Sequence, residues 1–232
     1  MRYTFCIVNL CLAAALCAQS AKPDFSGVWE RPYVPDMTKN GKDQQGSGEL
    51  PFTAWGAEQW KAYNAEAFDY TGHCLPQGLT RSMNSPFPIQ IVQTPATFVV
   101  LYEAWNVFHV APIHRGPIPV DAKGFPKDMY PTWMGTSVAR WDGDTMVVET
   151  TGFNGKTNLD TVGHPHSDQM SVTERYTLTD PKHIRYEVTL TDPKTYTKPV
   201  SNVRTFTLRT DWEVMEYSCM ENNKDLLDGH LK

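Results

Sequence analysis

The sequence has little that would support binding of nucleic acid or chemistry on nucleotides. Its 232 residues include 21 Lys and Arg against 26 Asp and Glu, a formal net charge of −5, and basic residues form no run. A mildly acidic chain of this kind is a poor match for a phosphate backbone. The sequence also lacks a phosphate-binding loop, a dinucleotide fingerprint and a Gly-x-Ser-x-Gly elbow. We therefore expect no nucleic acid as a partner, no nucleotide cofactor and no serine hydrolase of the elbow type.

Long hydrophobic runs are missing too, with one exception near the start. The run from Cys6 to Ala18 follows Arg2, has Asn9 as its only polar interruption and is followed by small residues. It has about 13 residues, whereas about 20 are needed to cross a bilayer. We expect residues 1–20 to be a cleaved signal peptide and the mature protein to be secreted or periplasmic, without a membrane span.

Cysteine is scarce, and three of the five cysteines lie within the expected signal peptide. Cleavage leaves Cys74 and Cys219 in a chain that is sent to an oxidising compartment, where a disulfide between them is the natural pairing. The alternative is a reactive thiol nucleophile, which would need one cysteine to stay reduced. Closing a loop of about 145 residues stabilises a fold by up to about 5 kcal/mol in the chain-entropy model.

One helix and a series of strands account for most of the remaining sequence. Thr53 can cap a helix over residues 54–68, where Trp60, Tyr63 and Ala67 recur at helical spacing. Later segments are short, rich in Val, Thr and aromatic residues, and separated by turn pairs such as Asp142-Gly143. The expected strands are Phe98–Tyr102, Trp105–Val110, Ser137–Trp141, Thr145–Thr151, Met170–Thr179, His183–Thr191, Val200–Leu208 and Trp212–Ser218.

Sequential antiparallel strands must protect their edges, and closure into a barrel does so most completely. We therefore predict a mainly β fold for residues 21–232. We expect this region to be a single antiparallel lipocalin-like β-barrel domain with one N-terminal helix and long connecting loops.

The strands on either side of Asp180-Pro181 predict what faces the barrel interior. Their even-numbered residues are mostly apolar, so the register that unites them places Arg175 opposite Glu187 outside, and Glu174 opposite Val188 inside. The following strand places Arg204 on the same inner face. We expect Arg204 as a partner for Glu174, and two effects then oppose each other. Desolvation favours the neutral acid of Glu174, while the guanidinium favours the carboxylate.

Two resemblances support the barrel. Gly27-Val28-Trp29 resembles the Gly-x-Trp opening of the lipocalin-like (calycin) barrels, in which the Trp lies beneath an Arg of a late strand; this resemblance implies Arg204 or Arg209 here. Further segments resemble a family of exported bacterial proteins to which no activity is attached, which implies a compartment and no catalytic residue. These segments include Asp24-Phe-Ser-Gly-Val-Trp, Trp133-Met-Gly, Arg140-Trp-Asp-Gly-Asp-Thr, Gly163-His-Pro-His-Ser167, Val172-Thr-Glu-Arg and Glu216-Tyr-Ser-Cys.

Polar residues are densest between Gly152 and Arg175, a long connection of the kind that often carries function. Asp160, His166 and Glu174 are the candidate catalytic residues, as a proton-transfer set. His164 and His166 are candidate ligands for zinc or copper. A metal would need a further ligand, for which the candidates are Asp160, Glu174, His109 and His114. The alternative is a structural loop whose histidines bond to backbone groups.

Aromatic side chains near strand ends favour a pocket for a small molecule. The candidate ligand-binding residues are Trp105, His109, Trp133, Trp141, Tyr196 and Arg204. We expect an exported protein that binds a small apolar or aromatic molecule in the barrel cavity. The alternative is an enzyme, a lyase, isomerase or hydrolase, that uses the His/Asp/Glu cluster at the barrel mouth. The sequence indicates no oligomeric state.

Overall fold

The computed structural model describes residues 22–64, 69–114, 129–221, 223–224 and 228. The expected signal peptide, residues 1–20, lies outside these ranges. Within them, no helix is long and apolar enough to cross a bilayer.

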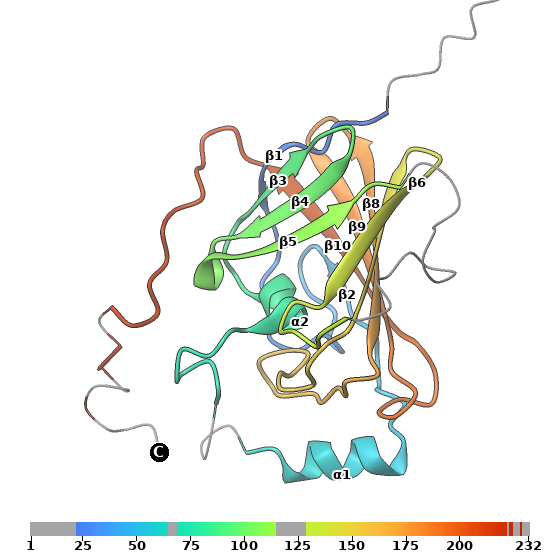
Figure 1. Ribbon diagram of the computed structural model, residues 1–232, viewed down its shortest axis with the longest axis vertical. Coiled ribbons are helices and arrows are strands. Elements are labelled where there is room, and N and C mark those ends of the chain that lie inside the picture. Colours follow the sequence, from blue (N-terminus) through green and yellow to red (C-terminus); the bar gives the residue numbers. More distant parts are fainter. Residues whose placement is uncertain (1–21, 65–68, 115–128, 222, 225–227, 229–232) are drawn as a thin grey trace, which may run out of the picture.

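Among the described residues, ten strands form one antiparallel sheet that curves into a nearly closed barrel (Figure 1). Along the sheet the strands follow the order β5-β4-β3-β1-β10-β9-β8-β7-β6, and the two-residue β2 pairs with β10. The strands are β1 Gly27–Glu30, β2 Gln44–Gln45, β3 Ile89–Gln93, β4 Thr97–Tyr102, β5 Val107–Pro112, β6 Thr136–Asp142, β7 Thr145–Thr151, β8 Ser171–Asp180, β9 His183–Thr191 and β10 Val200–Leu208. The predicted mainly β, antiparallel barrel is confirmed.

The barrel closes where its two outermost strands, β5 and β6, meet. Ile113, directly after β5, forms a parallel bridge with Ala139 of β6, and the backbone N–H of His114 donates to the Ala139 carbonyl at 2.9 Å. Within the described ranges, this bridge is the backbone pairing that joins the two ends of the sheet. We call this junction the seam.

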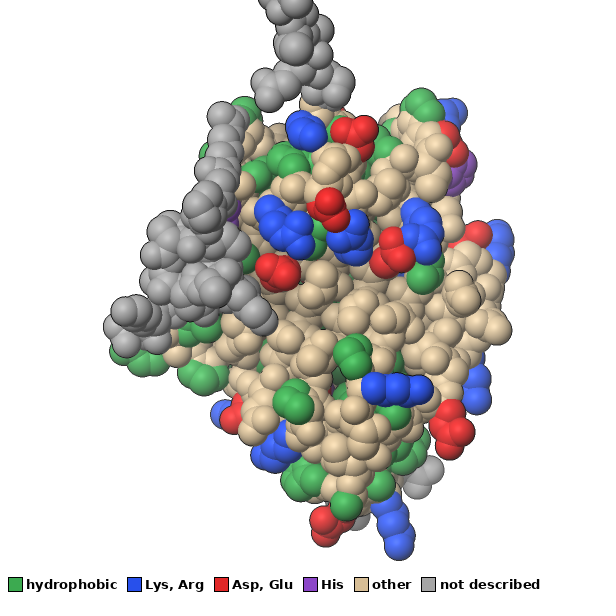
Figure 2. All heavy atoms as spheres, turned by 90° about the vertical axis from the view of Figure 1, so that its right-hand side faces the viewer, with side chains coloured by type: hydrophobic (Ala, Val, Ile, Leu, Met, Phe, Trp, Pro, Cys, Tyr) green, Lys and Arg blue, Asp and Glu red, His purple; other side chains and the backbone are tan. Residues whose placement is uncertain are grey.

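The predicted register of β8 and β9 is confirmed. Glu174 pairs with Val188, and Arg175 pairs with Glu187. The side chains that point inward come from even-numbered positions, because side chains alternate along a strand. The outward Arg175 forms its ion pair with Asp142 at 2.8 Å, on the neighbouring hairpin. Figure 2 shows basic and acidic side chains next to one another on the upper part of one face.

The barrel interior is filled by side chains. Phe25 packs against Phe98 and Trp141, with ring centroids 6.1 Å apart in both pairs, and Tyr186 stacks on Phe206 at 4.7 Å. All of these except the partly buried Trp141 are at most 2% exposed. A core packed in this way contributes stability through buried apolar area.

Two α-helices lie outside the sheet in the part of the chain that the structure describes, where one was predicted. α1 (Ala54–Ala62) begins as expected, because the Thr53 hydroxyl accepts from the Gly56 N–H at 3.1 Å. It ends six residues before the predicted Phe68, and residues 65–68 are outside the described ranges. α2 (Gly78–Asn84) is buried along its whole length at the lower end of the barrel in Figure 1.

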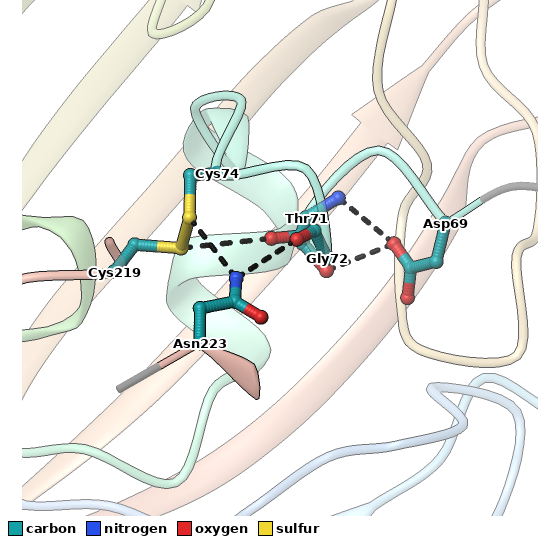
Figure 3. Close-up of a disulfide and its surroundings, with 6 residues drawn as sticks. All are labelled: Asp69, Thr71, Gly72, Cys74, Cys219 and Asn223. Atoms are coloured by element: carbon teal, nitrogen blue, oxygen red, sulfur yellow. Dashed lines mark hydrogen bonds between the residues drawn. A yellow bond between two sulfur atoms is a disulfide. The ribbon is translucent and has the colours of Figure 1, made fainter. Parts of the chain in front are cut away.

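The predicted disulfide is present and attaches the C-terminal segment to the turn before α2 (Figure 3). Cys219 bonds to Cys74, and the Asn223 amide donates to the Gly72 carbonyl at 3.0 Å. Arg81 of α2 donates to the carboxylate of Asp69 in the same turn, also at 3.0 Å. The disulfide therefore holds the C-terminal segment to the turn that precedes α2.

The predicted strand at Trp212–Ser218 is wrong. The backbone there bonds to side chains, since the Tyr217 N–H donates to Asn106 Oδ1 at 3.2 Å and the Met215 N–H donates to Glu103 at 3.0 Å. Both partners lie in the turn between β4 and β5, where the 3-10 helix Ala104–Asn106 replaces the start of the predicted strand at Trp105. These two backbone N–H groups are thus bonded to side chains and not to a neighbouring strand.

Candidate functional site

A cavity of about 620 Å³ opens at the seam between β5 and β6. We call it the seam cavity. Its walls are mostly apolar, and two of their side chains are open to the surface, with Phe108 61% and Val110 44% exposed. Its lining residues are Asn106, Val107, Phe108, His109, Val110, Pro112, His114, Met134, Gly135, Thr136, Ser137 and Val138.

Two buried polar side chains, His109 and Ser137, belong to the cavity lining. His109 Nε2 forms a hydrogen bond with the Ser137 hydroxyl across the seam. The Thr150 hydroxyl of β7 lies 2.9 Å from Ser137 Oγ and 3.2 Å from His109 Nε2. Burial lowers the pKa of His109, an effect that the nearby Glu174 partly offsets. The imidazole is therefore neutral near pH 7 and can accept a proton.

Glu174 is fully buried, and its carboxylate lies next to the His109 ring. Its Oε1 accepts from the Tyr176 hydroxyl at 2.7 Å and from the Tyr186 hydroxyl at 3.0 Å. Burial raises the pKa of both tyrosines well above the ordinary value, so both remain donors. Its Oε2 has no hydrogen-bond partner and lies 3.5 Å from His109 Nδ1. We call Glu174, His109, Ser137 and Thr150 the seam cluster.

The expected ion pair between Glu174 and Arg204 is wrong, although both side chains face inward. The Arg204 guanidinium donates to the Met83 carbonyl at 2.6 Å, to Asn202 Oδ1 at 2.7 Å and to the Asn84 side chain. Tyr186 separates the charges: its hydroxyl donates to Glu174, and its ring centre lies 5.7 Å from the Arg204 guanidinium carbon. Arg204 therefore connects β10 to α2.

The second cluster lies in the connection between β7 and β8, and we call Asp160 and His164 the loop cluster. Asp160 Oδ2 lies 2.7 Å from His164 Nδ1 and accepts from the Met37 N–H at 2.9 Å. The His164 ring stacks on Trp60 of α1 at 4.4 Å. A polar cavity of about 480 Å³ adjoins it, lined by Thr38, Lys39, Gly48, Glu49, Leu50, Phe52, Trp60 and His164.

His166 does not share the partners of His164. Its Nε2 bonds to the Thr157 hydroxyl at 2.6 Å and its Nδ1 donates to the Ser167 carbonyl at 3.0 Å. Burial lowers the pKa of this imidazole. Both ring nitrogens of His166 are thus engaged within the loop, as in the structural alternative that the sequence left open.

Among the described residues, the group of three side chains that could hold a metal is Asp36, Asp160 and His164, with ligand atoms within 4.8 Å of one another. His166, Glu174, His109 and His114 are not in it. The existing bonds compete with a metal, because His164 Nδ1 is already bonded to Asp160 and the Asp36 carboxylate accepts from Thr38. These residues fit a hydrogen-bonded pair better than the open ligand set of a zinc or copper centre.

Of the predicted ligand-binding residues, only His109 lines the seam cavity. Trp105 stacks on Tyr217 at 4.9 Å, and Trp141 stacks on Phe25. The Tyr196 hydroxyl donates to the Pro165 carbonyl at 2.6 Å, in the loop region. Trp133 precedes the lining residue Met134, and Arg204 lies in the interior.

Trp29 of the Gly-x-Trp segment is buried, and its indole N–H donates to the Phe25 carbonyl at 2.9 Å. Arg209 forms ion pairs with Glu30 and Asp211 and lies 3.9 Å from the centre of the Trp212 ring. The two arginines that the resemblance implied are thus engaged elsewhere, Arg204 at α2 and Arg209 at the surface.

Sequence reasoning missed Ser137 and Thr150 as site residues. Both lie in strands that were predicted, and alternation would have placed them inside. Their meeting with His109 depends on β5 and β6 being neighbours, which no local pattern indicates.

No protein-family model matches the chain, and no curated protein matches it. Among solved structures, the chain is similar to the crystal structure of a mutant of the fluorescent protein UnaG, at 16% sequence identity and a TM-score of 0.36. The match covers 81% of this chain and 97% of that chain. At these values the similarity says nothing about ligand or activity, and the site is interpreted from its own geometry.

Proposed function

We propose that this protein binds a small apolar molecule that carries one hydrogen-bonding group, and that it binds this molecule in the seam cavity. The observation that carries the proposal is the lining: apolar walls from β5 and β6 surround two buried polar side chains, His109 and Ser137. Pockets for small molecules have this composition, in which the walls supply affinity and a few polar groups fix orientation. Without a bound molecule, the exposed apolar side chains of Phe108 and Val110 are in unfavourable contact with water.

Titration with the fluorescent probe N-phenyl-1-naphthylamine tests the proposal. The variant Val110→Trp fills the cavity, and Val92→Trp is the matched control, because Val92 is similarly exposed on β3 and does not line the cavity. We expect the dissociation constant to rise at least about 10-fold in Val110→Trp, which corresponds to about 1.4 kcal/mol. The control should bind as the wild type does. Equal binding by all three proteins would contradict the proposal.

The sequence-based alternative, an enzyme that uses His164, His166, Asp160 and Glu174 either around zinc or copper or as a proton-transfer set, is supported less well. Glu174 lies in the barrel interior with Tyr176 and Tyr186, whereas Asp160 bonds to His164 in the loop. Zinc or copper remains a prediction for elemental analysis of the purified protein. Stoichiometric metal that is lost in His164→Ala and retained in His166→Ala would assign it to the group of Asp36, Asp160 and His164.

A further inference from the structure

Three side chains of the seam cluster stand in the order of a nucleophile, a base and an orienting acid. Ser137 Oγ is hydrogen-bonded to His109 Nε2, and His109 Nδ1 lies 3.5 Å from Glu174 Oε2. They come from β6, β5 and β8, three strands that are far apart in the sequence. This order of groups defines catalytic triads on unrelated folds, where it is recognised by geometry and not by a sequence motif.

The hydrogen bonds also give each group the proton that its role requires. Glu174 Oε2 lacks any other hydrogen-bond partner, so it favours the tautomer with a proton on His109 Nδ1. His109 Nε2 then carries the lone pair and faces the Ser137 hydroxyl. Thr150, 2.9 Å from Ser137 Oγ, can donate to that oxygen while Ser137 donates to the imidazole. A neutral imidazole in this position is a general base.

The backbone at Ser137 supplies a donor for a developing negative charge. The Ala139 carbonyl faces β5, because it accepts from the His114 N–H. Backbone groups alternate in direction along a strand, so the N–H of Ser137, two residues earlier, points to the same side. It faces the seam cavity, where a substrate carbonyl oxygen next to Ser137 Oγ would lie. Such donors stabilise the oxyanion of an acyl-transfer intermediate.

We propose that the seam cluster hydrolyses small carboxylic esters with an apolar acyl group, with Ser137 as the nucleophile and His109 as the general base. Glu174 is a positioning residue, since it is fully buried and acts through His109. The apolar walls of the cavity hold the acyl chain. This inference rests on the proposed binding of an apolar molecule in the same cavity.

The reaction has two halves. In the first, a bond forms between Ser137 Oγ and the acyl carbon, the serine proton moves to His109 Nε2, and the alcohol leaves with that proton as its C–O bond breaks. In the second, the oxygen of a water molecule bonds to the acyl carbon while His109 takes a proton from that water. The bond between the acyl carbon and Ser137 Oγ then breaks as His109 returns the proton to Ser137 Oγ. The carboxylic acid is released, and the seam cluster returns to its starting state.

The test combines hydrolysis of 4-nitrophenyl butyrate with labelling by a fluorophosphonate, which forms a covalent adduct with an activated serine. We expect a rise in intact mass of one adduct, located on the peptide that contains Ser137, and hydrolysis that is lost at least about 100-fold in Ser137→Ala. The control Ser201→Ala removes an exposed hydroxyl on β10 and should retain both. Hydrolysis that persists in Ser137→Ala, or an adduct on another residue, would overturn the proposal.

Glu174→Gln separates positioning from a structural role. The amide is the same size and can still accept from the two tyrosines, so we expect probe binding to change less than about 3-fold while hydrolysis falls at least about 100-fold. Because Glu174 raises the pKa of His109, any residual activity should have its inflection at a lower pH than in the wild type. An unchanged rate and pH profile would exclude Glu174 from the reaction.

Binding and hydrolysis fail in distinguishable ways. If the wild type binds N-phenyl-1-naphthylamine in the seam cavity but neither hydrolyses the ester nor takes up the fluorophosphonate, the catalytic inference is wrong and the proposed binding stands. If the probe does not bind in the cavity and Ser137 is not labelled, both are wrong.

Discussion

The seam cluster and the loop cluster each contain a buried carboxylate beside an imidazole, yet they are held in different ways. In the loop cluster, Asp160 accepts from the backbone N–H groups of Met37 and His164 as well as from the imidazole. In the seam cluster, Glu174 is bonded to side chains alone, and one of its oxygens faces only His109.

The difference separates a structural role from a chemical one. A carboxylate that accepts backbone N–H groups fixes the course of the chain, and its removal leaves several buried donors without partners. A carboxylate that faces one imidazole fixes the orientation and tautomer of that ring. The comparison predicts that substitutions in the loop cluster affect stability most, whereas those in the seam cluster affect mainly the proposed hydrolysis.

Asp160→Ala should have the largest effect on stability. It leaves the Met37 N–H, the His164 N–H and the imidazole unpaired, and we expect a loss of about 3 to 5 kcal/mol in the free energy of unfolding. Urea denaturation followed by tryptophan fluorescence measures it. Asp168→Ala is the matched control, because Asp168 is exposed in the same connection and should change stability by less than about 0.5 kcal/mol. Similar losses in both variants would contradict the structural role of Asp160.

Removing the disulfide should have the next largest effect. Arg81 contacts both the Asp160 carbonyl and the carboxylate of Asp69, so the turn that carries Cys74 is connected to the loop cluster. We expect Cys74→Ser/Cys219→Ser to lose about 2 to 4 kcal/mol in urea denaturation. A reductant should destabilise the wild type by the same amount and leave the double variant unchanged. A reductant effect on the variant would show that another cause is at work.

Acid should weaken the fold through two buried histidines, His109 of the seam cluster and His166 in the same connection as the loop cluster. Burial lowers the pKa of both imidazoles in the folded protein. The unfolded chain therefore binds protons first as the pH falls, so stability is lost below the ordinary histidine pKa of about 6.5. We expect His166→Gln to remove on the order of 1 to 2 kcal/mol of the fall between pH 7 and pH 5. A fall in stability between pH 7 and pH 5 that is as steep in His166→Gln as in the wild type would contradict the assignment.

Thr150→Val should have the smallest effect. It removes one hydroxyl of the seam cluster, while Ser137 keeps its bond to His109. We expect a loss of about 0.5 to 1.5 kcal/mol in urea denaturation. A loss as large as that of Asp160→Ala would mean that the seam cluster contributes as much to stability as the loop cluster does.

The sequence predicted the features that depend on local pattern. The register that places Glu174 opposite Val188 follows from period-two alternation, and the start of α1 follows from the capping residue Thr53. The pairing of Cys74 with Cys219 follows from arithmetic once the first three cysteines are set aside. Each of these predictions depends on the residues of one segment or hairpin, or on a single pair of cysteines.

Features that depend on the closed barrel were not predictable in this way. α2 lacks an apolar period because it is buried on all sides, so Gly78–Asn84 gives no amphipathic pattern. The expected bond between Glu174 and Arg204 was wrong because Tyr186 separates them, a fact of packing that alternation cannot supply. The contact of His109 with Ser137 exists only because the two ends of the sheet meet.

The strand order has a consequence for the time at which the fold can form. β1 pairs with β10, and β10 also pairs with β9, so the first and last strands are neighbours although nearly the whole sequence separates them. During synthesis at about 5 to 20 residues per second, Trp29 is made many seconds before its partner Leu208. Until then β1 and β9 each lack one neighbouring strand, and a nascent chain that stops short of β10 leaves those two edges unpaired.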